Sequence, residues 1–436
     1  MREPVATLRG LSATIPKPRP RTLPAPLQPL GPPEPRPRSL EGEPPASTRG
    51  PSTPPPPIGP SVAAGSLEAE LPRSNVDPFA ALFSAPQLRE PSPYPRIVLA
   101  PRPRHARYEY MELLKRLLRE IYRVTARLPG TILHAGRRLT EYQLATLRGG
   151  PGVYVVDLDG VAESEASEAA LRRLAAGLED RLRELYAQPP GFIVLYGSGE
   201  RLLRLRRLWG PGLRFLGATL PLPLEARIPE DDAVFTLLEA AYSLPDGSLS
   251  RLGSLDEAAV WAEEALHRCL RAAAADPLLG RLTRLAGDEE EARPDEAPIH
   301  YALKAVAVAY LLESGFRETR IETETALGGN IVVDVVARGR GWGGASIAIE
   351  AETLYGSMNP AARLNWIAST RLMVADQVWM VLQPHTAFIY LPHVETVVRR
   401  HGGRLEIYIV DPSTCLLKPY TEYRSRLLDA LARLEG

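Results

Sequence analysis

Two apolar segments in the last third of the chain, each carrying acidic residues, constrain its fold more than any other feature. Ile331–Ala337 and Ser346–Glu352 are rich in Val, Ile and Ala and are joined by a Gly-rich turn, which predicts a β-hairpin. Side chains alternate along a strand, so Glu350 and Glu352 project from one face. Asp334 lies in the middle of the first segment. If the strands pair, three carboxylates converge, and oxygen ligands of this kind favour a hard divalent cation, Mg²⁺ or Mn²⁺.

The segments around this hairpin predict an ordered series of helices and strands. A helix and a strand precede it and another helix and strand follow, at Ile299–Ser314, Arg320–Ala326, Pro360 to about Val374, and Val378–Leu382. Helix, three strands, helix and strand, with Asp334 and the Glu350-x-Glu352 pair, resemble the PD-(D/E)XK nuclease superfamily. The resemblance covers residues 299–436 and implies a restriction-endonuclease-like α/β core with a mixed sheet flanked by helices.

The resemblance implies roles for four residues. Asp334 and Glu350 would bind the metal, and Glu352 would be a further ligand or the base that orients water. Glu352 stands where the family usually has Lys, and some restriction endonucleases with this core carry Glu there. Arg363, on the following helix, would supply the missing positive charge. The implied function is a metal-dependent nuclease that hydrolyses phosphodiester bonds, with DNA as the expected nucleic acid. The alternative is an inactive nuclease-like fold that binds DNA or serves in assembly.

Basic residues near this hairpin are the candidates for contact with nucleic acid. Lys304 lies at the start of the first helix and Arg371 on the second, while Arg338 and Arg340 belong to the Gly-rich turn. Each has an alternative interpretation, as a surface lysine at a helix start, a solvated helix face or a long hairpin loop. We expect these four side chains to face the phosphate backbone.

Residues 105–287 predict a second, smaller α/β domain. Val153–Asp157, Phe192–Tyr196 and Leu213–Leu216 are apolar strands, and a helix is expected at Glu165–Tyr186, so the sheet should be parallel. Ligands of such sheets bind beyond the carboxyl ends of the strands. The Gly197-Ser198-Gly199 turn at that edge could hold phosphate, which makes a nucleotide binder the third interpretation, or it is an ordinary loop.

The first 104 residues hold more than half of the chain's 44 prolines, mixed with Arg, Ser and Gly. Such a segment cannot bury enough apolar surface to fold, so we expect a disordered arm, whose Arg-Pro clusters could contact a protein partner. Residues 288–298 are acidic and contain two prolines, which predicts a linker.

Bulk composition limits the class of protein. The net charge is zero, so binding of nucleic acid would depend on local basic patches. No apolar run approaches the ~18 residues that a membrane helix needs. The two cysteines, Cys269 and Cys415, form no disulfide framework, and a cytoplasmic protein is the expectation. A homodimer stays open.

Overall fold

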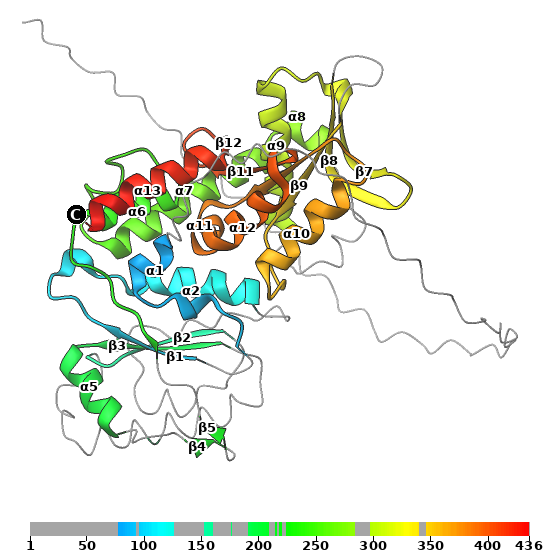
Figure 1. Ribbon diagram of the computed structural model, residues 1–436. Coiled ribbons are helices and arrows are strands. Elements are labelled where there is room, and N and C mark those ends of the chain that lie inside the picture. Colours follow the sequence, from blue (N-terminus) through cyan, green and yellow to red (C-terminus); the bar gives the residue numbers. More distant parts are fainter. Residues whose placement is uncertain are drawn as a thin grey trace, which may run out of the picture. The chain divides into compact units, whose positions relative to one another are not determined.

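In its described residues, the computed structural model contains two larger β-sheets with helices packed around and between them, and one small two-stranded sheet (Figure 1). It describes residues 77–92, 96–125, 152–159, 176, 191–208, 214–215, 218–219, 224–283, 297–339 and 346–435. All of these residues fall within one compact unit of the chain. The predicted arm up to residue 76, most of the predicted linker and most of the predicted helix at Glu165–Tyr186 lie outside the described residues.

The first sheet has four parallel strands in the order β2-β3-β1-β6. They are β1 (Arg96–Pro101), β2 (Val153–Asp157), β3 (Phe192–Gly197) and β6 (Leu224–Glu225). All residues of β2 and β3 are buried, as expected of parallel strands covered on both faces. The predictions of a parallel sheet and of β2 and β3 are confirmed.

The third strand predicted for this sheet is wrong. Residues at Leu213–Leu216 form β4 (Arg214–Phe215), which pairs antiparallel with β5 (Ala218–Thr219) in a separate two-stranded sheet. The place beside β3 belongs instead to β1, which precedes Tyr108 and pairs with β3 along its whole length. Sequence order misled the prediction because the central strand comes first in the chain.

The ordered fold therefore begins well before residue 105, which corrects the predicted boundary of the arm. Helix α1 (Pro78–Phe83) starts at Asp77, whose side chain accepts a hydrogen bond from the Ala80 amide. Phe79 and Phe83 are fully buried and pack in the main hydrophobic core. This apolar segment and β1 bury enough surface to offset their ordering, although prolines surround them.

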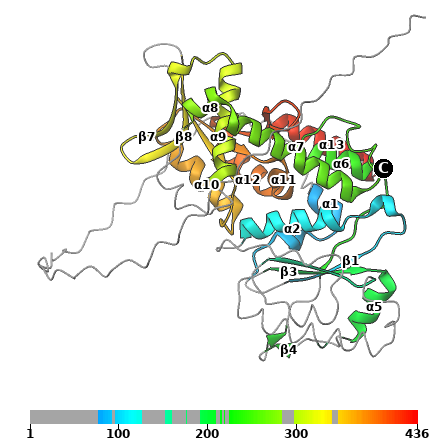
Figure 2. The ribbon, with the colours of Figure 1, turned by 180° about the vertical axis from the view of Figure 1, so that it is seen from behind.

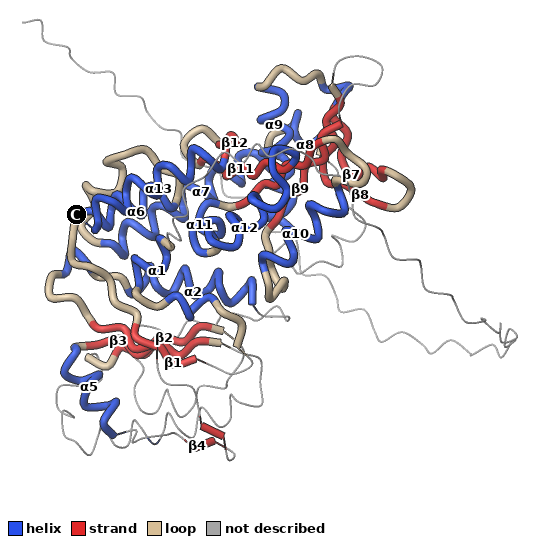
Figure 3. Tube along the Cα trace, viewed as in Figure 1, coloured by secondary structure: helices blue, strands red, loops and turns tan. Residues whose placement is uncertain are grey.

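Helix α2 (Met111–Thr125) joins the two halves of the fold. Figures 1, 2 and 3 show it between the parallel sheet and the other helices. It packs against β2 and β3 on one side and against α7 (Leu255–Ala275) and α11 (Pro384–Ile389) on the other. One hydrophobic core runs from the first sheet to the second, and α7 also packs on α9 (Ala297–Glu313). The predicted division at residues 288–298 is thus not a boundary between independent cores.

The second sheet has six strands in the order β12-β11-β10-β9-β8-β7. They are β7 (Ile321–Leu327), β8 (Ile331–Arg338), β9 (Ser346–Glu352), β10 (Gln377–Leu382), β11 (Leu405–Asp411) and β12 (Leu416–Pro419). The strands β7, β8 and β9 pair antiparallel, and β10 is parallel to β9 and to β11. At the edge of the sheet, β12 pairs antiparallel with β11. The mixed sheet and the order helix, three strands, helix, strand are as predicted.

Further helices complete the structure. They are α5 (Gly199–Leu208), α6 (Ala233–Ala241), α8 (Pro277–Leu282), α10 (Pro360–Arg371), α12 (Leu391–His401), α13 (Tyr420–Glu435) and the short 3₁₀ turns Pro86–Arg89, Ala106–Tyr108, Glu318–Arg320 and Gly402–Arg404. Local sequence fixes several helix starts, because Ser254 Oγ accepts from the Glu257 amide at 3.1 Å and Asn359 Oδ1 from the Ala362 amide at 3.0 Å. Across the described residues, no helix combines the length and apolarity that crossing a membrane requires.

Candidate functional site

The three predicted carboxylates gather at one place on the second sheet. Strands β8 and β9 pair with Val335 opposite Ile349 and Val336 opposite Ala348, which brings Asp334 beside the end of β9. One carboxylate oxygen of Asp334, Oδ2, accepts a hydrogen bond of 2.8 Å from the amide of Ala351, the residue between the two glutamates. Glu350 and Glu352 are 4% and 6% exposed. We call Asp334, Glu350 and Glu352 the acidic cluster.

Asp334 also contacts a histidine that the sequence did not single out as its partner. The Nε2 atom of His300, in the first turn of α9, lies 3.1 Å from Asp334 Oδ2. Burial alone would raise the pKa of Asp334, but the hydrogen bond and charge of His300, and the charge of Lys304, lower it below its ordinary value. The signal for this pairing is the four-residue spacing that puts His300 and Lys304 on one face of α9.

Glu350 lies against Arg371 from the end of α10. Arg371 Nε is 2.5 Å from Glu350 Oε1, and its Nη2 is 3.3 Å from Oε2. Burial, and next the negative charge of Asp334, raise the pKa of Glu350 to about 8 in spite of this arginine. Arg371 therefore only partly offsets the effects of burial and of the neighbouring carboxylate.

Glu352 has Arg363 as its partner, with Nη2 of the arginine 3.0 Å from Oε1. The pKa of Glu352 is raised by burial, an effect that Arg363 only partly offsets. The Arg363 side chain is 45% exposed, whereas that of Arg371 is 13% exposed. Arg363 therefore reaches the cluster from solvent, as a charge that can contact both the carboxylate and an incoming ligand.

The residues predicted to contact nucleic acid are placed less favourably. Lys304 is fully buried and its Nζ lies 2.5 Å from Glu324 Oε1, so the prediction that it faces phosphate is wrong. Arg371 is occupied by Glu350, which corrects its assignment as a backbone contact. Arg338 is exposed and pairs with Glu322 at 3.2 Å, and Arg340 lies outside the described residues. An apolar sheet covers α9, and this burial of the helix overrides the surface position expected for a lysine.

The cluster has the right chemistry for a divalent cation but not yet its geometry. Carboxylate oxygens are the donors that Mg²⁺ and Mn²⁺ take. Among the described residues, however, no group of three or more His, Cys, Asp or Glu side chains is arranged to hold a metal ion. His300, Arg371 and Arg363 each occupy one carboxylate, so a metal would compete with them.

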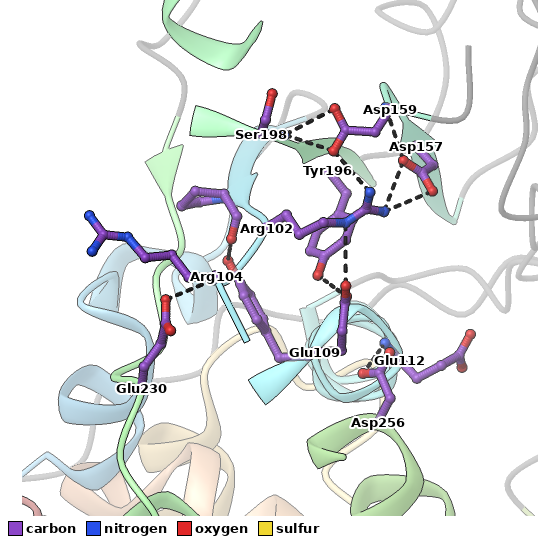
Figure 4. Close-up of polar contacts among 12 residues, drawn as sticks. Arg102, Arg104, Glu109, Glu112, Asp157, Asp159, Tyr196, Ser198, Glu230 and Asp256 are labelled. Carbon is purple, nitrogen blue, oxygen red and sulfur yellow. Dashed lines mark hydrogen bonds and ion pairs between the residues drawn. The ribbon is translucent and has the colours of Figure 1, made fainter. Parts of the chain in front are cut away.

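A second polar site lies at the carboxyl edge of the parallel sheet (Figure 4). Arg102, directly after β1, points between three carboxylates: its Nε lies 3.3 Å from Glu109, its Nη2 3.1 Å from Asp157 and its Nη1 2.9 Å from Asp159. Burial alone would lower the pKa of Arg102, yet these carboxylates raise it. Its guanidinium carbon lies 5.0 Å from the centre of the Tyr196 ring.

A pocket of about 480 Å³ opens beside Arg102. The charged groups in its lining are one arginine, Arg102, and four carboxylates, those of Glu109, Asp157, Asp256 and Glu257. The other lining residues are Ala106, Met111, Tyr196, Gly253 and Ser254. The lining favours positive charge over phosphate.

In the Gly197-Ser198-Gly199 turn, the carboxylate of Asp159 already accepts a hydrogen bond from the Ser198 amide. The Ser198 amide lies 2.9 Å from an Asp159 carboxylate oxygen, where a phosphate would have to sit. The ordinary-loop interpretation is therefore the better one, and the nucleotide-binding interpretation loses its support.

Comparison with protein-family models, with curated proteins and with solved structures finds no match for this chain.

Proposed function

We propose that the C-terminal part of the chain, 297–435, is a metal-dependent nuclease of the PD-(D/E)XK type that hydrolyses phosphodiester bonds, with DNA as its substrate. The observation that carries the proposal is the hydrogen bond from the Ala351 amide to Asp334, which places an aspartate of β8 against the backbone between Glu350 and Glu352 of β9. Three carboxylates so close together in a sheet do nothing for packing and need a counter-charge.

The residues divide into ligands and supporting groups. Asp334 and Glu350 would hold the metal, and bound Mg²⁺ or Mn²⁺ would polarise the phosphate and lower the pKa of a water ligand. Glu352 lies at the same end of β9 and would orient or deprotonate the attacking water. Arg363 contacts Glu352 from solvent and would stabilise charge on the phosphate. His300 holds the Asp334 carboxylate in place.

The second candidate is a nuclease-like fold without catalysis, acting in DNA binding or assembly. One observation favours it: each carboxylate of the cluster already has a basic partner, from His300, Arg371 and Arg363. A cluster neutralised in this way can be a structural ion-pair network. The two candidates differ in whether a metal displaces the arginines.

Cleavage and metal binding separate the two. Labelled single-stranded, duplex and branched DNA, and RNA, would be incubated with Mg²⁺, Mn²⁺ or EDTA and wild type, Asp334→Asn or Glu350→Gln. Glu322→Gln is the matched control, because Glu322 is an exposed acidic residue of the same sheet. We expect metal-dependent cutting by wild type and the control, and loss in both cluster variants. A metal-induced rise in melting temperature should disappear in the same two variants.

If wild type neither cuts nor gains stability from either metal, the hydrolase is refuted and the structural ion-pair network remains.

A further inference from the structure

An exposed tryptophan lies next to the acidic cluster. Trp366, in the middle of α10, keeps 53% of its surface exposed. The guanidinium carbons of Arg363 and Arg371 lie 5.3 and 5.9 Å from the centre of its rings. These are the same two arginines that hold Glu352 and Glu350. The indole is therefore within one side chain of the cluster and open to solvent.

Further basic residues lie on the helix that packs against α10. Helices α10 and α12 pack side by side (Figure 1). Asn365, next to Trp366 in the chain, accepts a hydrogen bond of 3.0 Å from Arg400 Nη1 and contacts His401 Nε2 at 3.0 Å. Arg400 is exposed, as is Arg363. We call Arg363, Asn365, Trp366, Arg400 and His401 the α10–α12 face.

An exposed indole among arginines fits one kind of partner best. A flat aromatic ring stacks on a nucleobase whatever its sequence, and neighbouring arginines bind the phosphates on either side. In a duplex both faces of each base are covered by neighbouring pairs, so stacking on a side chain needs an unpaired base. An apolar protein partner would gain nothing from Arg363 and Arg400.

We propose that Trp366 is a base-stacking subsite and that the α10–α12 face binds single-stranded nucleic acid, DNA or RNA. This rests on the proposed function in that it places an unpaired strand next to the acidic cluster. A base on Trp366 would put its phosphate within reach of Arg363, and thus near Glu352. The substrate of the cluster is then an unpaired strand, a flap or an end, and not an intact duplex.

The test measures binding without catalysis. Fluorescence anisotropy of labelled single-stranded DNA, single-stranded RNA and the matching DNA duplex would be recorded in EDTA with wild type, Trp366→Ala and Trp366→Phe. Stacking on one aromatic side chain typically changes affinity about 5- to 150-fold, so Trp366→Ala should weaken single-strand binding by about tenfold. Trp366→Phe should restore most of it, and the weaker duplex binding should not change.

Trp261→Ala is the matched control, because Trp261 is also partly exposed, at 37%, but lies on α7. It should bind single strands as wild type does. Wild-type preference for duplex, no binding of single strands, or equal loss in the Trp366 and Trp261 variants would each overturn the proposal. Trp366-dependent binding without any metal-dependent cutting would keep the subsite and remove the hydrolase. Cutting that does not depend on Trp366 would keep the hydrolase and remove the subsite.

Discussion

Glu120 offers the sharpest test of how the two sheets are held together. It lies in α2, is buried, and accepts hydrogen bonds from Thr386 Oγ1 at 2.6 Å and from the Tyr355 hydroxyl at 3.1 Å. His385 Nε2 lies 3.5 Å from the same carboxylate. Thr386 and His385 belong to α11, and Tyr355 follows β9, so one carboxylate joins α2 to the second sheet and its helices. We predict that Glu120→Ala strongly destabilises the protein.

The magnitude follows from the surroundings of the carboxylate. Burial alone would raise the pKa of Glu120, but His385 and the hydrogen bonds outweigh it and lower the pKa from 4.5 to about 2. A shift of this size corresponds to about 3 kcal/mol of stability. Because the folded pKa is the lower one, this stability is present above pH 4.5 and is lost as the pH falls to about 2. Removing the carboxylate also leaves its buried partners unpaired, so we expect a loss of about 3–5 kcal/mol at neutral pH.

Urea unfolding at neutral and at acid pH measures this. The control is Glu112→Ala, since Glu112 lies in the same helix and pairs with Lys115 in a partly exposed position. Surface pairs of that kind contribute about 0–1 kcal/mol. The difference between wild type and Glu120→Ala should shrink as the pH falls toward about 2. A Glu120→Ala variant within about 1 kcal/mol of the Glu112 control at neutral pH would refute the reasoning.

Three further predictions concern buried polar groups. Burial raises the pKa of Asp256 from 3.8 to about 6, so the free energy of unfolding falls as the pH rises through this range. Asp256→Asn should therefore add up to about 3 kcal/mol to the free energy of unfolding above about pH 6, and almost nothing below about pH 4. Urea unfolding across this pH range measures both. Lys304→Met removes the buried ammonium that pairs with Glu324, whose side chain is 11% exposed, and should cost about 3–5 kcal/mol; an unchanged melting curve would contradict the ion pair. Tyr423→Phe loses the hydroxyl that donates to Ala241 O at 2.9 Å and should cost about 1–3 kcal/mol by the same assay.

Local pattern was enough to predict most of the second sheet, but not its edge strand β12. The runs rich in Val, Ile and Ala in Ile331–Arg338 and Ser346–Glu352, the Gly-rich turn between them and the Asn359-Pro360 helix start are signals contained within a few residues. Each describes its own segment, so each survives whatever surrounds it. The expectation that Asp334 meets Glu350 and Glu352 follows from the same hairpin, because side chains of paired strands alternate between the two faces of the sheet.

The contacts between segments that are distant in the chain could not be predicted from local sequence. β1 became the centre of the first sheet although prolines surround it, and Lys304 became a buried ion-pair partner although lysines usually face solvent. Arg102 joins Glu109, which lies nearby in the chain, to Asp157 and Asp159, which lie far along it at the end of β2. Contacts of this kind depend on which surfaces meet when the chain collapses, and no window of a few residues contains that information.

The sequence by itself thus determined the strands of the second sheet other than β12, the helices α9 and α10, and the pairing of β8 with β9, since these depend on neighbours along the chain. Only the tertiary structure decided that His300 and Arg371 would contact Asp334 and Glu350 and that Trp366 would stay exposed beside them. The reason is physical: burial and charge pairing are properties of the space that several elements enclose together.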